Sequence, residues 1–135
     1  MENLEFPNEE SLSKFHQDVL WWKLNIQFVE TEILFINRLI NSAAFEQDIP
    51  NLFEQLDKFK HQIKTETRAL ENLKEDVNNH DGKMQNMAEC EDLFCDAVYL
   101  KNHDTLKIHF ERFFKSFGEL KSKIFNYTGS ILKNT

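Results

Sequence analysis

VLWWKLNIQFVETEILFINRLI, residues 19–40, is the stretch that decides how this chain folds. Fourteen of its twenty-two side chains are apolar, and two adjacent tryptophans lie among them. Four charged side chains, Lys23, Glu30, Glu32 and Arg38, interrupt the run. A membrane-spanning helix needs roughly twenty apolar residues with almost no charge. The stretch therefore predicts a helix that packs against protein and does not cross a membrane.

The apolar residues of this stretch recur at alternating steps of three and four, which is the spacing of one helix face. This inner stripe runs from Leu12 to Ala43. Two further stripes with the same spacing run from Ile49 to His80 and from Leu106 to Ile131. The pattern has no strand-like alternation, so the sequence predicts an all-α protein.

The stripes and the residues between them predict four helices, the third of them short, over about residues 9–44, 49–81, 84–101 and 104–132. Gly82 follows the second stripe and suits a left-handed residue after a helix end. Extending the last stripe backwards reaches His103, Tyr99 and Asp96, which are poor core residues. The helical register is therefore expected to slip near Asn102. The alternative is three long helices, the last of them kinked.

Length and composition favour one domain, residues 1–135, built from few long elements. Three glycines and two prolines leave little turn material, which argues against an all-β fold. Cys90 and Cys95 are five residues apart and point in different directions on a helix, so free thiols are expected. The first residues, MENLEFPNEE, lack the basic start of a secretory signal. These features together predict a cytoplasmic protein.

Charge bears on both the partners and the packing. The net charge of −7 argues against a nucleic-acid partner, which requires a basic face. Residues 1–50 carry three basic and nine acidic side chains (−6), whereas residues 101–135 carry seven basic and three acidic ones (+4). Opposite charges favour contact between the first and last helices, and short connections favour antiparallel neighbours. An up-and-down antiparallel bundle is the predicted architecture.

The first helix carries a second row of apolar residues, about 120° around the helix from its inner stripe. We call this row the outer stripe; it consists of Trp21, Leu24, Phe28, Phe35 and Leu39. A long apolar row is rarely left in water by a monomer. The row is therefore predicted to be the interface of a homodimer or the docking site of a partner helix. The alternative is that the later helices of the same chain cover it.

The sequence offers no set of residues with the spacing of an active or metal site. None of the five histidines has a carboxylate three residues before it or an acid or a second histidine four residues after it, so no metal site is predicted. Glu66 interrupts the second stripe and is the one candidate buried polar residue. His80 and His103 also fall on extended stripes, and they are expected at solvent-exposed helix ends. No catalytic residue and no cofactor is predicted.

Two segments carry a resemblance to a known group of proteins. FVETEILFINRL (Phe28 to Leu39), followed by FEQLDKFKHQI (Phe53 to Ile63), resembles small bacterial helical-bundle proteins of unknown function. The resemblance implies a helical bundle and no particular site. The residues themselves favour a non-enzymatic interaction or self-association module. A small-molecule or metal-binding four-helix bundle is the alternative.

Overall fold

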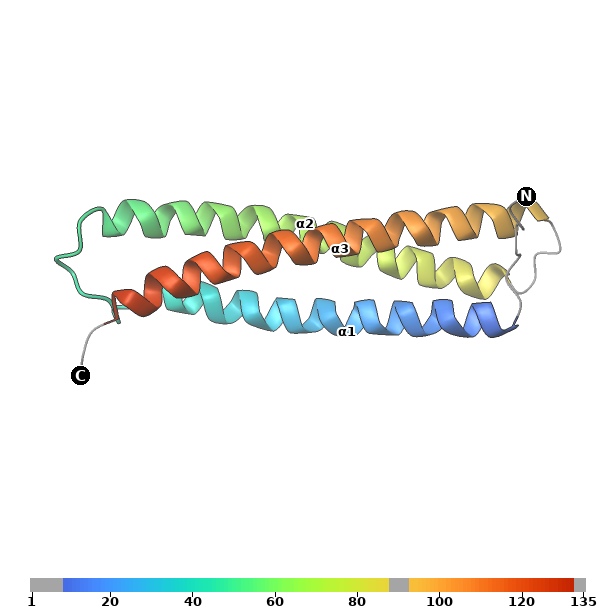
Figure 1. The fold of residues 1–135 in the computed structure, drawn as a ribbon, viewed down its shortest axis with the longest axis horizontal. Coiled ribbons are helices and arrows are strands. Elements are labelled where there is room, and N and C mark those ends of the chain that lie inside the picture. Colours follow the sequence, from blue (N-terminus) through green and yellow to red (C-terminus); the bar gives the residue numbers. More distant parts are fainter. Residues whose placement is uncertain (1–8, 88–92, 133–135) are drawn as a thin grey trace.

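The computed structural model describes residues 9–87 and 93–132, which form three long α-helices (Figure 1). They are α1, Glu9–Ile40; α2, Leu52–Met87; and α3, Leu93–Ser130. Each helix runs antiparallel to the one before it, so the predicted all-α bundle is confirmed. The predicted division into four helices is wrong, and the three-helix alternative matches the structure.

The second helix does not end at Asp81 as predicted but continues through Gly82 to Met87. Gly82 has no positive φ, so it is an ordinary helical residue and not a left-handed cap. Contacts to the other helices hold this part of α2. His80 is buried, and Asp81 pairs with Lys23 of α1. Tertiary packing has overridden the weak local preference of these residues for a helix end.

The predicted break near residues 102–103 is also wrong, because α3 passes through it without interruption. The stripe of the last helix continues backwards through two polar residues that are buried: His103 is 3% exposed and Tyr99 is 4% exposed. The sequence predicts that neither belongs to the core, because each side chain carries polar atoms. Both lie in the core, and partners from α1 and α2 accommodate the polar atoms of His103.

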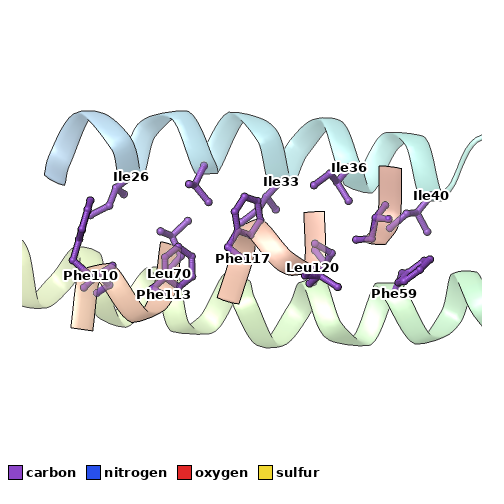
Figure 2. Close-up of a cluster of buried hydrophobic side chains, with 14 of the residues drawn as sticks. Ile26, Ile33, Ile36, Ile40, Phe59, Leu70, Phe110, Phe113, Phe117 and Leu120 are labelled. Carbon is purple, nitrogen blue, oxygen red and sulfur yellow. The ribbon is translucent and has the colours of Figure 1, made fainter. Parts of the chain in front are cut away.

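The core is a continuous apolar layer between the three helices (Figure 2). It contains the inner stripe of α1 from Val19 to Ile40 and the facing residues of α2 and α3. Full burial of each such side chain stabilises the fold by about 1.5–3 kcal/mol. The largest completely buried side chains include Ile36, Ile63, Phe117 and Ile124.

The loop between α1 and α2 closes one end of the bundle. α1 ends at Ile40, four residues earlier than predicted, and the chain turns at Asn51, whose φ of 59° lies in the left-handed region that asparagine tolerates. Phe45 of the loop is buried, and it forms a β-bridge with Leu132. The backbone N–H of Glu46 donates to the carbonyl of Ile131 at 3.0 Å. This loop therefore joins the end of α1 to the end of α3.

Candidate functional site

A chain of hydrogen bonds joins the three helices at the opposite end of the bundle. His80 of α2 and His103 of α3 face each other, with Nε2 of His80 2.8 Å from Nδ1 of His103. The other nitrogen of His103, Nε2, lies 3.0 Å from Oδ2 of Asp18 on α1. Both imidazoles are almost completely buried, whereas the side chain of Asp18 is 34% exposed. We call these three residues the histidine cluster.

Aromatic rings enclose the histidine cluster. The ring of Tyr99 stacks on His80 with a centroid distance of 4.4 Å and an interplanar angle of 16°. Phe15 and Trp22 of α1 lie against His103, at centroid distances of 4.4 Å and 4.8 Å. Outside the rings, Lys23 of α1 forms an ion pair with Asp81 of α2. The two imidazoles thus pack against aromatic rings, with Asp18 and the ion pair between Lys23 and Asp81 at the edge.

Burial disfavours the charged form of His80. The pKa of His80 is lowered from 6.5 to about 4, chiefly because burial removes solvent from the charged form. The neighbouring His103 and Lys83 contribute to this lowering, and Asp81 partly opposes it. Burial also raises the pKa of the Tyr99 phenol. With His80 neutral, one hydrogen between Nε2 of His80 and Nδ1 of His103 satisfies these two facing nitrogens.

The hydroxyl of Tyr99 is the unsatisfied group of this region. Its oxygen is buried, and within the described part of the chain it has no hydrogen-bond partner. A buried hydroxyl without a partner costs free energy and is uncommon in native proteins. The ring of Tyr99 therefore contributes packing while its oxygen destabilises the site.

The geometry of the histidine cluster suits a structural role better than metal binding. Two nitrogens bound to one zinc ion each lie about 2.0–2.1 Å from it, and a tetrahedral angle then holds them more than 3 Å apart. The nitrogens of His80 and His103 are closer than that, at a hydrogen-bond distance. Across residues 9–87 and 93–132 no group of three or more histidine, cysteine or acidic side chains is placed to hold a metal ion.

The expectation that His80 and His103 lie at solvent-exposed helix ends is wrong. Both sit well inside helices, and the polar atoms of each find partners on another helix. The signal was present in the spacing, because both residues fall on the three-and-four pattern of their stripes. What the spacing could not show was that the two histidines would meet.

Glu66 is not buried in the core; it is half-buried at an open groove between α2 and α3. Oγ of Ser116 donates to its Oε1 at 2.7 Å, and Arg112 and His109 line the same groove. No second carboxylate joins Glu66 in a hydrogen bond among the described residues. The hydrogen bond to Ser116 therefore provides a register contact between the two helices, and a second carboxylate, Asp76, lines the same groove.

The outer stripe of α1 is left largely uncovered by α2 and α3. Trp21 is 61% exposed, Phe28 59%, Phe35 57% and Leu24 45%. Leu39, the fifth predicted member, is instead half-buried and packs against the core. Phe35 touches Phe125 of α3 edge-on, with centroids 6.2 Å apart, and Phe125 is itself 37% exposed. Four members of the stripe thus form an apolar surface beside α3.

The charged residues of α1 between Trp21 and Phe35 are paired inside the chain. Lys23 pairs with Asp81, Glu30 with Lys74 at 3.2 Å, and Glu32 with Lys121 at 2.7 Å. Between Trp21 and Phe35 there is no other charged side chain. Between Trp21 and Phe35, α1 therefore carries no charged side chain that lacks an intrachain partner.

Comparison with known proteins gives no assignment to a family. None of the described helices combines the length and the apolar character that a membrane crossing requires. No protein-family model matches the chain, and neither a curated protein nor a solved structure is significantly similar to it.

Proposed function

We propose that this protein is a non-enzymatic interaction module that forms a homodimer through the outer stripe of α1. The observation that carries the proposal is the exposure of Trp21, Leu24, Phe28 and Phe35 on one helix face. Tryptophan and large aromatic side chains are the usual anchors of protein interfaces. Trp21, Phe28 and Phe35 recur every seven residues, so they line up along the helix as a seam for another helix.

The apolar area of the outer stripe fits a modest dimer interface. An aromatic side chain presents about 150–250 Å² when fully exposed. At roughly 60% exposure, the three aromatic residues offer about 350 Å² per copy, and Leu24 brings the sum to about 400 Å². Two copies would bury about 800 Å² of apolar surface. Homodimer interfaces are about 65% apolar, so the whole contact would reach about 1,200 Å², the lower end of stable interfaces.

The charge pattern favours a second copy over a charged partner. The three charged side chains of α1 between Trp21 and Phe35 are each compensated by an intrachain ion pair. A charged partner helix would therefore gain little from pairing with these three side chains. A two-fold symmetric contact places the same surface on both sides, and an apolar uncharged stripe is complementary to itself.

Replacing Trp21 and Phe28 together with glutamate tests the proposal. Both side chains are exposed, so the double variant should keep the helicity of the wild type. Light scattering coupled to size-exclusion chromatography should show a wild-type dimer and a monomeric variant. Leu34→Glu is the matched control, because Leu34 is 60% exposed on α1 but lies off the outer stripe. That variant should remain dimeric.

Two results would overturn the proposal. One is a wild-type protein that stays monomeric at several hundred micromolar. The other is equal dissociation by Leu34→Glu, which would show that the effect comes from added charge and not from the stripe. Unfolding of the double variant would instead place the stripe inside the fold, and that also contradicts an exposed interface.

A further inference from the structure

We propose that the histidine cluster acts as a pH-sensitive latch. It holds one end of the three-helix bundle closed as long as no more than one of the two imidazoles is positively charged, and protonation of both imidazoles opens that end first. The inference is independent of the dimer proposal. It rests on the position of the cluster, on the geometry of its hydrogen bonds and on the charges around it.

The hydrogen bond between the two imidazoles requires a single hydrogen between the two facing nitrogens. Nε2 of His80 and Nδ1 of His103 face each other at 2.8 Å, so one nitrogen must donate and the other accept. When both rings are protonated, two N–H groups point at each other and no acceptor remains. Both rings are almost completely buried, so little solvent is available to replace the lost partner.

The surrounding charges compensate one imidazolium but not two. On α1, the carboxylate of Asp18 bonds directly to His103, and Lys23 adds a positive charge nearby. On α2, Asp81 is paired with Lys23, and Lys83 opposes protonation of His80. On α3, Tyr99 stacks on His80 and remains neutral. Among the described residues Asp18 is the one carboxylate bonded to the pair. Asp81 favours protonation of His80 but is already paired with Lys23, and Asp76 and His109 line an open groove that reaches His80. A second positive charge on the pair would therefore have no carboxylate bonded to it.

Opening is expected at this end alone, because the rest of the core does not titrate. Among the residues whose burial the structure describes, His80 and His103 are the buried ionisable side chains besides Tyr99, and the third buried polar residue, Thr128, is neutral. The opposite end is closed by apolar packing around Phe45 and by the backbone bond between Glu46 and Ile131. Local opening of one unit, while the remainder stays folded, is a common behaviour of native proteins.

Trp22 provides a reporter for the latch. Its ring lies 4.8 Å from His103, and a protonated imidazole quenches indole fluorescence at such distances. The chain has two tryptophans, so Trp21→Phe leaves Trp22 as the single emitter and keeps an aromatic ring on the outer stripe. Trp22 emission and far-ultraviolet circular dichroism are recorded together from pH 7 to pH 3. The emission change should occur at a pH at least half a unit above the main loss of helicity.

Pepsin, which is active in acid, locates the opening. The first cleavages should fall within residues 15–22 or 99–106, while residues 36–63 remain protected. Coincident emission and helicity transitions, or first cleavages at the Phe45 end, would overturn the inference. Either result would show that the bundle opens as a whole or from its apolar end.

Two variants establish that the histidines cause the transition. The double change His80→Phe and His103→Phe replaces both rings with apolar rings of similar shape, and it should move the Trp22 transition by more than one pH unit towards acid. His80→Gln, which keeps an amide near the position of Nε2 and does not titrate, serves if the double variant does not fold. His61→Gln is the control, because His61 is exposed on α2. An unchanged midpoint in the histidine-cluster variants would refute the latch.

Discussion

Removing the hydroxyl of Tyr99 is expected to stabilise the protein, although the residue is almost completely buried. The Tyr99 ring packs on His80 and on Phe15, with centroids 4.4 Å and 5.7 Å away, and phenylalanine preserves these contacts. The oxygen has no partner among the described residues. A buried polar group without a hydrogen bond costs about 1–3 kcal/mol. Tyr99→Phe should therefore raise the free energy of unfolding by about 1–2 kcal/mol.

Urea denaturation followed by circular dichroism measures this change. The midpoint should move to higher urea with an unchanged slope, because the variant exposes the same surface on unfolding. For a chain of this length the melting temperature should rise by about 3–8 °C. Tyr127→Phe is the matched control, since Tyr127 is half-buried and packs edge-on against Phe59 at 5.7 Å. Its midpoint should change little.

A lower midpoint for Tyr99→Phe would refute the reasoning. It would mean that the hydroxyl makes a stabilising hydrogen bond in solution, to an ordered water or to another part of the chain. The aromatic shell of the histidine cluster would then be more polar than its described residues indicate.

Three further predictions concern pH, the core and the surface. The pKa of His80 is lowered from 6.5 to about 4 in the folded state, so the unfolded chain binds more protons between these values and the stability contributed by His80 is lost as the pH falls from 6.5 towards 4. At about 1.4 kcal/mol per pKa unit the loss reaches about 3 kcal/mol, and urea titrations at pH 7 and pH 4.5 that give equal free energies would contradict it. Phe117→Ala removes a fully buried ring and should lower the free energy of unfolding by about 3–5 kcal/mol in the same assay; a loss below 1 kcal/mol would show that the core is loosely packed. The surface pair between Lys74 and Glu30 should contribute less than about 1 kcal/mol in a double-mutant cycle, and a larger coupling energy would show that the pair is shielded from solvent.

The helical stripes could be predicted from the sequence because burial follows directly from apolar spacing. From Val19 to Ile40, the apolar residues at alternating steps of three and four on α1 are all buried. The outer stripe was predicted from angles around the same helix, and four of its five members are exposed. Leu39 was misplaced because the end of α1 turns into the loop, where the bundle closes around it.

Polar residues on the stripes could not be placed in the same way. Glu66 and His80 both interrupt the stripe of α2, yet one is half-buried at a groove and the other lies in the core. The difference depends on what lies across the helix interface, Ser116 in one case and His103 in the other. A single helix does not contain that information. The predicted number of helices is wrong for the same reason. A polar residue such as His103 on an apolar stripe indicates the end of a helix unless its partners on the other helices are known.

The odd number of helices has a mechanical consequence. α1 begins at one end of the bundle and α3 finishes at the other, as Figure 1 shows. The 38 residues of α3 span about 57 Å at a rise of 1.5 Å per residue. A force applied between Glu9 and Ser130 therefore acts along the helix axes. The helices have to slide past one another over their whole length and cannot be peeled apart turn by turn, so the bundle should resist tension in this direction more strongly than a hairpin pulled from one end.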